Sequence, residues 1–420
     1  MSAHAHDHDT GQPLLPVEEA RRRVLDAVAP LPPRRLSLRD AHGCVLAEDV
    51  AAPGDLPPFT SSAMDGFAVR AADVAGATID APTPLRIVGR VAMGRASGVA
   101  VGPGEAVAVP TGGVIPEGAD AVVPIERCVV DGDLVRVLQG EPPGRHVRRA
   151  GEDARRGERL VPRGRRLLAG EVGLLASAGI ADVAVHPRAR VLVVSTGDEL
   201  VEPGEATGPG RIPDANSLTL HGQIVEAGAI PVPAGIVPDD ADALLEALAA
   251  HRQRADVFVS SGGVSVGERD PVKRAFRARS DVRFVEVAMQ PGKPQAFGTV
   301  HGRPFFGLPG NPVSVFVSFE VFVRPALMAM MGRPPDRPEV TATLESDIGG
   351  PPEKTRFARV RVRREDGRWT ASSTGGRQSN LLSTVARANG LAVIPPGVAV
   401  ARAGEPCRVM LFRDADEVPS

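Results

Sequence analysis

Between residues 188 and 332, strand-like apolar runs alternate with helical segments, and this alternation constrains the fold more than any other feature. Strands are expected at residues 191–195, 230–237, 257–260 and 305–308. Helices are expected to begin near Asn216 or Ser217, after Asp239-Asp240, and at Val313. Strands and helices that alternate at this spacing are typical of a parallel, doubly wound sheet.

Three segments rich in glycine and hydroxyl residues follow the predicted strands. They cover residues 195–200, 260–267 and 307–314. Ligands of open parallel sheets bind outside the C-terminal strand ends, and glycine turns let backbone N–H groups approach phosphate oxygens. One such turn often serves chain geometry alone. Three in one domain predict an anionic small-molecule ligand.

Charged residues accompany these turns. Lys293 lies in a Pro-Gly-Lys-Pro turn, where it is either a point charge for phosphate or a solvent-exposed turn residue. Glu199, Asp239 and Asp270 follow predicted strands, and carboxylates beside a phosphate site favour Mg²⁺. Asp239 and Asp240, taken singly, are more typical of helix N-caps. The sequence contains no Walker A motif, H-E-x-x-H motif or serine nucleophile elbow.

The regions that flank this α/β segment have a different sequence pattern. From about residue 50 to 147, short β-type runs lie between glycine and proline turns, and residues 338–415 again alternate like strands after a proline-rich linker. The histidines at positions 4, 6 and 8 are better explained by a disordered polar tail than by a metal site.

Composition narrows the class of protein. The 49 basic and 51 acidic residues nearly balance, which argues against a nucleic-acid or anionic-membrane partner. The three cysteines are scattered, as in reduced cytoplasmic proteins. No apolar run approaches the ~20 residues that cross a membrane. We therefore expect a cytoplasmic protein of two to four domains.

Three further motifs precede the α/β segment in the chain. The first is Pro58-Phe59 with Ser62-Ala63-Met64-Asp65-Gly66-Phe67-Ala68-Val69-Arg70. The second is Thr111-Gly112 followed by Pro116-Glu117-Gly118-Ala119-Asp120-Ala121-Val122-Val123, and the third is Arg149-Ala150-Gly151-Glu152-Asp153. Together with the three glycine segments and the Pro-Gly-Lys-Pro turn, these ordered motifs resemble the molybdopterin molybdenumtransferase family, and the similarity runs from about residue 14 to 412.

The resemblance implies a multidomain α/β plus β fold in an elongated four-domain subunit. A helical and mixed linker domain would comprise residues 14–52 and 148–187, interrupted by a β-rich inserted module at 53–147. A doubly wound α/β/α molybdopterin-binding domain would cover 188–332, and a C-terminal β-barrel-like domain 338–415. The family also implies a homodimer, with the Asp65 signature facing the partner's α/β domain across an intersubunit active site.

The implied reaction is the insertion of molybdenum from molybdate into adenylylated molybdopterin, with Mg²⁺ as cofactor and AMP as product. By motif position, the expected catalytic residues are Asp65, Glu199, Asp239, Asp270, Thr111 and Asp153. The expected Mg²⁺ ligands are Glu199, Asp239 and Asp270. The pterin phosphate or adenylate would be held by Asn216, Ser261, Gly262, Gly263, Ser265, Lys293, Pro309, Gly310 and Asn311.

Two other functions fit parts of this pattern. Molybdopterin adenylyltransferase has a similar α/β domain but usually consists of that domain alone. A non-catalytic pterin carrier would need the phosphate loops but not the carboxylates. The family further implies contact with the adenylyltransferase or with acceptor molybdoenzymes. One departure is notable: residues 376–380 read Gly-Arg-Gln-Ser-Asn where the family commonly has Gln-Gly-Ser-Gly.

Overall fold

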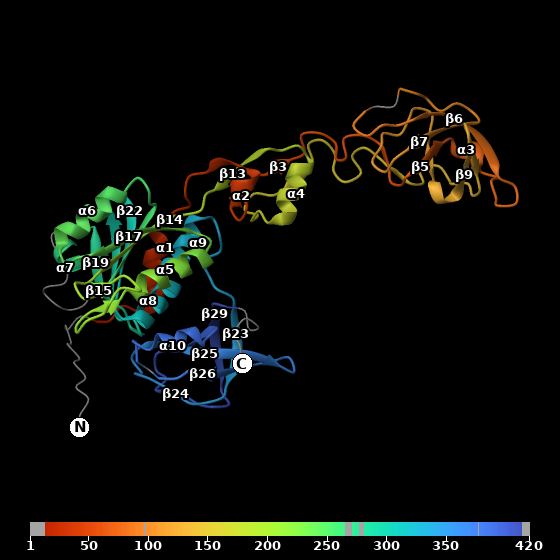
Figure 1. Ribbon diagram of the computed structural model, residues 1–420. Helices are drawn as coiled ribbons and strands as arrows, with labels where there is room; N and C mark the ends of the chain where they lie inside the picture. Colours follow the sequence, from red (N-terminus) through yellow and green to blue (C-terminus); the bar gives the residue numbers. More distant parts are fainter. Residues whose placement is uncertain (1–12, 96–97, 265–270, 277–280, 377, 414–420) are drawn as a thin grey trace. The chain divides into compact units, whose positions relative to one another are not determined.

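The computed structural model describes residues 13–95, 98–264, 271–276, 281–376 and 378–413. It divides into two compact units. One comprises residues 1–33 and 186–420, and the other comprises residues 34–185. Figure 1 labels their elements.

The first unit contains a six-stranded sheet in the order β17-β14-β18-β22-β21-β19. The four parallel strands are β14 (Arg190–Thr196), β17 (Ile230–Val237), β18 (Val257–Ser261) and β22 (Arg303–Leu308). The last two, β21 (Pro294–Val300) and β19 (Val282–Glu286), run antiparallel at one edge. Because β17 and β18 flank β14 on opposite sides, the strand order reverses there, which makes this the switch point of the sheet.

Alternate residues of the central strands bury opposite faces of this sheet. In β14, Val191 and Val193 pack with α5 (Ala215–Glu226), while Leu192 and Val194 pack with α6 (Ala241–His251). The helix α7 (Pro271–Phe276) joins α6 on its face. Helices on both faces confirm the predicted doubly wound domain.

The longest helical run, Pro312–Met330, forms the core of this unit. It consists of α8 (Pro312–Ser318), a π-helical turn η2 (Phe319–Val323) and α9 (Arg324–Met330). Contrary to the sequence expectation, this run is long and apolar enough by composition to span a membrane. However, 94% of its apolar window is buried within the fold, which is the environment of a core helix.

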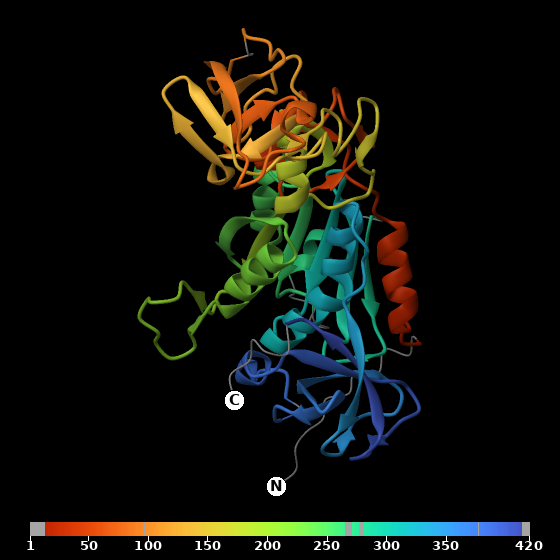
Figure 2. The same ribbon diagram turned by 90° about the vertical axis from the view of Figure 1, so that its right-hand side faces the viewer.

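The amphipathic helix α1 (Val17–Asp26) packs against the α/β domain. Its buried residues Val17, Ala20 and Val24 join the core that contains α5 and α9. In Figure 2, α1 stands beside this domain, where it contacts α9. The structure thus places α1 with the α/β domain, although residues 14–52 were expected to form one linker domain. The spacing of apolar residues in the sequence predicts which face of such a helix is buried, but not which domain it packs against.

The C-terminal strands form a closed β-barrel. The sheet order is β20-β25-β26-β23-β29-β27, in which β20 (Met289–Gln290) pairs with the start of the barrel strand β25 (Thr355–Glu365). An additional pairing of β25 with β27 (Gly390–Ile394) closes the ring. The other ring strands are β23 (Glu339–Leu344), β26 (Arg368–Ser373) and β29 (Pro406–Leu411). The predicted barrel-like domain is therefore confirmed, and closure leaves its ring without a free edge.

The second unit contains an open six-stranded sheet in the order β8-β5-β7-β6-β10-β9. Its strands are β5 (Gly66–Val69), β6 (Thr83–Arg90), β7 (Glu105–Val109), β8 (Ala121–Pro124), β9 (Cys128–Asp131) and β10 (Leu134–Val137). A smaller sheet pairs β1 (Arg34–Ser37) with β13 (Asp182–His186) and β2 (Val45–Leu46), beside α2 (Leu38–Ala41) and α4 (Ala169–Ser177).

Candidate functional site

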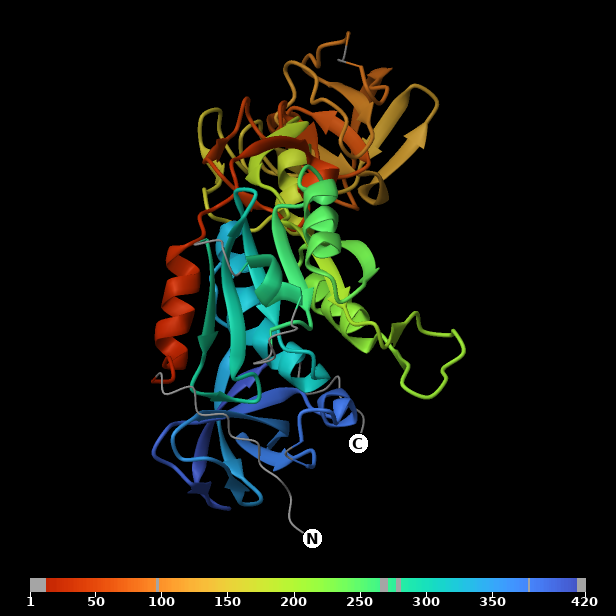
Figure 3. The same ribbon diagram turned by 90° about the vertical axis from the view of Figure 1, so that its left-hand side faces the viewer.

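A cavity of about 820 Å³ lies at the C-terminal ends of β14, β18 and β22. The three glycine-containing segments predicted from the sequence meet there. Nine of the predicted site residues line it: Glu199, Asn216, Asp239, Ser261, Gly262, Gly263, Pro309, Gly310 and Asn311. Figure 3 shows the segment that carries β15 (Leu200–Val201) and β16 (Ile212–Pro213) reaching away from the sheet.

Close backbone approach explains the glycines of this cavity. Gly262 has φ +91°, and a Cβ there would lie 2.7 Å from the carbonyl oxygen of Thr196. A Cβ at Gly310 would lie 3.8 Å from the Cα of Gly262, so the second and third glycine turns almost touch. Their main chains can therefore face a ligand with little side-chain bulk between them.

The helix α5 delivers Asn216 to the cavity, but Asn216 is not the N-cap. Asp214 caps this helix, since its carboxylate accepts hydrogen bonds from the N–H groups of Asn216 and Ser217, both at 3.1 Å. Asn216 instead donates from Nδ2 to the carbonyl oxygen of Gly310 at 2.7 Å. The amide thus fixes the third glycine turn against the start of α5.

Three carboxylates gather beside the first glycine segment. The main-chain N–H of Asp239 donates to Oδ1 of Asp198 at 3.1 Å, and a Cβ at Gly197 would lie 2.8 Å from Oε2 of Glu199. Partial burial raises the pKa of Asp239, and the negative charges of Asp198 and Glu199 raise it further. The neighbouring Asp240 serves as the cap of α6, as expected, and accepts from the N–H groups of Asp242 and Ala243.

Mg²⁺ suits this set of donors, since hard oxygen ligands are what it prefers and a cation would offset the repulsion that raises the pKa of Asp239. Within the described part of the chain, no group of three or more His, Cys, Asp or Glu is placed to hold a metal. The third predicted ligand, Asp270, lies outside the described residues, as does Ser265.

Lys293 does not line the cavity, although the next residue, Pro294, does. Its ammonium pairs with the carboxylate of Glu286 at 3.2 Å. Gln295 anchors the turn, because its Nε2 donates to the carbonyl oxygen of Gly292 and to Oγ of Ser318, both at 2.6 Å. The turn is therefore held in place, but its lysine forms an ion pair with Glu286 and does not line the cavity.

The remaining predicted residues belong to the second unit. The exposed Asp65 accepts a 2.6 Å hydrogen bond at Oδ1 from the main-chain N–H of Thr111. The next residue, Gly66, must be a glycine, because a Cβ there would lie 2.0 Å from the carbonyl oxygen of Val123 on the paired strand β8. Asp153 is exposed, and its main-chain N–H donates to the carbonyl oxygen of Leu56 at 3.0 Å.

Several cavity residues escaped the sequence reasoning. Thr196 lies within the first glycine segment, and Asp214 lies two residues before the predicted Asn216. Neither was predicted as a site residue. Ser314 follows the third glycine turn on α8. Asn380 comes from the barrel domain, in the segment that departs from the family pattern. Only a motif comparison that admitted Asn at this position could have found it.

A ligand-sized cavity at the switch point of a doubly wound sheet defines a small-molecule-binding α/β enzyme class. Three family models match the chain: the MoeA N-terminal region (domain I and II) at residues 15–179, a probable molybdopterin binding domain at 192–329, and the MoeA C-terminal region (domain IV) at 341–412. The chain belongs to the molybdopterin molybdenumtransferase family, a family of transferases.

Individual relatives match over nearly their whole length. A molybdopterin molybdenumtransferase 2 of Mycobacterium tuberculosis is 41% identical over 400 residues, 94% of this chain and 98% of the relative. The molybdopterin molybdenumtransferase of Bacillus subtilis is 34% identical over 406 residues, 95% and 94% of the two chains. The crystal structure of a molybdopterin biosynthesis moeA protein from Pyrococcus horikoshii has a TM-score of 0.72 and 31% identity, and the match covers 95% of this chain and 100% of that one.

Proposed function

We propose that the chain inserts molybdenum from molybdate into adenylylated molybdopterin. Water cleaves the phosphoanhydride bond of the adenylylated pterin, and AMP leaves. The two dithiolene thiols displace one oxygen of molybdate, which departs with their protons as water, and molybdenum stays bound to the two sulfurs. The observation that carries this proposal is the 820 Å³ cavity, because two glycine turns and two carboxylates, Glu199 and Asp239, border the same volume. Backbone N–H groups suit phosphate oxygens, and the carboxylates suit a cation beside them.

We infer that Glu199 and Asp239 hold Mg²⁺ together with Asp270. When bound, the ion supplies positive charge that neutralises the phosphoanhydride. The chain's own residues bind and position the ligand. The turns at Gly262-Gly263 and Gly310 bind the phosphate or adenylate, Asn216 holds the Gly310 turn in place through its 2.7 Å hydrogen bond, and Ser261 offers a hydroxyl to the ligand.

We further propose a homodimer in which Asp65 and Asp153 of one subunit complete the cavity of the other, with Thr111 holding Asp65 through its main-chain N–H. The support is that Asp65 is exposed and held in place by a main-chain donor, as a group that acts on a ligand from outside its own domain would be. A symmetric dimer then contains two composite sites.

The proposal is tested with purified protein, adenylylated molybdopterin, molybdate and Mg²⁺. We expect molybdate-dependent release of AMP and molybdenum that stays bound to the pterin. Tight pterin binding without AMP release under any oxyanion would indicate a carrier. Formation of adenylylated pterin from ATP and molybdopterin would indicate an adenylyltransferase, a function that leaves the flanking domains unexplained.

A further inference from the structure

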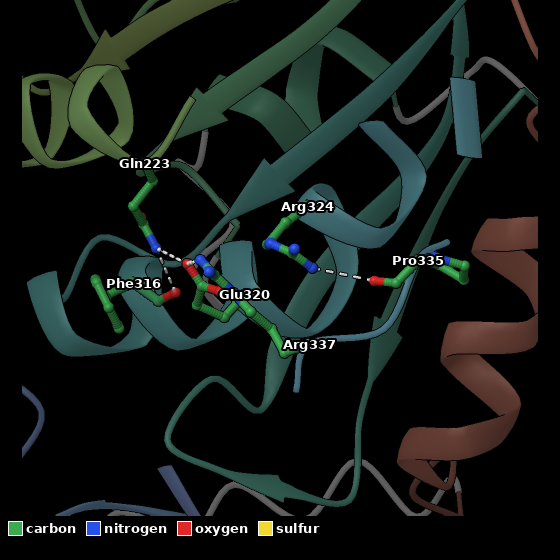
Figure 4. Close-up of polar contacts among 6 residues, drawn as sticks. All are labelled: Gln223, Phe316, Glu320, Arg324, Pro335 and Arg337. Atoms are coloured by element: carbon green, nitrogen blue, oxygen red, sulfur yellow. Dashed lines mark hydrogen bonds and ion pairs between the residues drawn. The ribbon is translucent and has the colours of Figure 1, made fainter. Parts of the chain in front are cut away.

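The linker between the α/β domain and the barrel is held at three consecutive residues. The carbonyl oxygen of Pro335 accepts a 3.1 Å hydrogen bond from Nη1 of Arg324, and Asp336 pairs with Arg21 of α1. Arg337 donates from Nε to Oε2 of Glu320 at 2.9 Å and from Nη2 to Oε1 at 3.3 Å. Each of these three linker residues is therefore bound to a different side chain of the α/β domain. Figure 4 shows the contacts of Pro335 and Arg337.

Glu320 is the centre of this arrangement. Its side chain is 0% exposed and projects from the π-helical turn η2. Besides Arg337, it accepts a hydrogen bond at Oε1 from Nε2 of Gln223 on α5 at 2.9 Å, and the same Nε2 reaches the carbonyl oxygen of Phe316 on α8 at 3.2 Å. One carboxylate thus joins α5, the long core helix and the linker.

Stability alone does not account for this buried pair. Removing two charges from water costs several kcal/mol per ion, and well-packed apolar residues of similar size are often as stabilising or more so. A small cavity of about 30 Å³ also borders Glu320 and Arg337. Buried ion pairs can instead select one geometry among several.

The elements joined by Glu320 begin at the substrate cavity. Asn216 on α5 and Asn311 before α8 line it, and the barrel contributes Asn380. The main-chain N–H of Val313 donates to the carbonyl oxygen of Ser379 at 3.0 Å, which brings the Asn380 loop onto the start of α8. The linker that Arg337 belongs to leads directly into this barrel.

We infer that Glu320 and Arg337 are positioning residues that hold the barrel, and with it Asn380, at the correct distance from the starts of α5 and α8. The cavity keeps its width because the linker is fixed to the same two helices. This inference rests on the proposed function only in naming the ligand of the cavity.

A pair of variants separates positioning from stability. Glu320→Gln leaves the guanidinium of Arg337 without its counter-charge, and we expect a lower Tm and a KM for adenylylated molybdopterin raised by about 3- to 30-fold, the range of couplings between distant sites. The double variant E320L/R337M replaces both charges. We expect it to regain the Tm while its KM stays raised and its kcat changes less. A double variant that regains both values would overturn the inference.

The matched control is Asp336→Asn, which removes the exposed ion pair to Arg21 at the adjacent linker position. The carboxylate of Asp336 is 73% exposed, so this change should leave both Tm and KM unchanged. A rise in KM equal to that of E320L/R337M would show that any loosening of the linker suffices, and would overturn the specific role of the buried pair.

Amide hydrogen exchange tests the same inference without turnover. In the substrate-free full-length protein, E320L/R337M should exchange faster than wild type at the amides of Val313 and Asn380, while the core of β14 is unchanged. Unchanged exchange at these amides would refute the positioning role even if molybdenum insertion is confirmed. Conversely, faster exchange in a protein that does not insert molybdenum would uphold positioning and reject only the proposed reaction.

Discussion

The main-chain N–H of Thr111 donates a 2.6 Å hydrogen bond to Oδ1 of Asp65, which joins two segments 46 residues apart in the sequence. Thr111 contributes its backbone to this contact. The hydroxyl of Thr111 is therefore not needed to hold the carboxylate, whereas the carboxylate charge is available to a ligand. This arrangement makes different predictions for the two residues.

We predict that Asp65→Asn lowers the rate of molybdenum insertion by about 100-fold or more, as expected for loss of a charge that acts in the reaction. The amide keeps an acceptor for the N–H of Thr111, so pterin affinity and Tm should be unchanged. Thr111→Ala, the control, retains the N–H and should stay within about 3-fold of wild type. Equal losses in the two variants would show that the hydroxyl itself takes part.

Mixing two inactive variants tests the composite site. In the proposed dimer, D65N and D239N inactivate opposite halves of each site, so a heterodimer of the two keeps one intact site. After dissociation and random reassociation of equal amounts, about a quarter of wild-type activity should return. Activity that stays at the level of the separate variants would place both carboxylates in sites within a single subunit.

The neighbouring aspartates at the start of α6 should respond in opposite ways. The pKa of Asp239 is raised by partial burial and by the charges of Asp198 and Glu199. A carboxyl with a raised folded-state pKa costs stability when ionised, and the cost disappears as the pH falls from the raised value toward the usual one. Asp239→Asn should therefore raise the Tm at pH 7 in metal-free buffer, with no gain at a pH below about 4, while insertion is lost.

Asp240→Ala is the matched control for that experiment. Asp240 accepts from the N–H groups of Asp242 and Ala243, and these backbone hydrogen bonds lower its pKa. Loss of the cap should lower the Tm modestly and leave the KM unchanged. We expect Mg²⁺ to raise the Tm of wild type and of D240A by similar amounts, and to leave the Tm of D239N unchanged. If Mg²⁺ stabilises D239N as strongly as wild type, Asp239 is not a ligand.

The two touching glycine turns offer a further contrast. At Gly262, with φ +91°, an alanine Cβ would lie 2.7 Å from a carbonyl oxygen, so Gly262→Ala should lower the Tm. At Gly310 the nearest atom would be 3.8 Å away, an ordinary contact, so Gly310→Ala should fold normally. Its KM should nevertheless rise about 10-fold if a phosphate approaches this backbone. An unchanged KM would move the phosphate away from the third turn.

Local patterns predicted which segments of the α/β domain line the cavity. The strands β14, β17, β18 and β22 follow from apolar runs of the expected length, and the rule that ligands gather at C-terminal strand ends brought Glu199, Asp239 and the glycine turns to one place. These inferences need only residues that are close in sequence and the general geometry of a parallel sheet.

Contacts between distant segments were not predictable in the same way. The ion pair of Lys293 with Glu286 depends on how β19 and β21 pair at the sheet edge. Asn380 reaches the cavity through long-range contacts of the barrel with α8, among them the rings of Phe316 and Phe412, which meet at 5.0 Å. Asp214 replaced Asn216 as the cap because several good capping residues lie within one turn, and propensity does not choose among them.

The antiparallel pairing of β1 with β13 places Arg34 opposite Val185, so the two ends of the second unit are neighbours in space. A segment with neighbouring ends can be removed and the gap bridged by a short linker without stretching what remains. The first unit, with its cavity and barrel, is therefore a candidate for expression as a minimal pterin-binding protein. The second unit could in turn be exchanged for that of a relative through two cut points, which would make chimeric enzymes a practical way to assign its contribution.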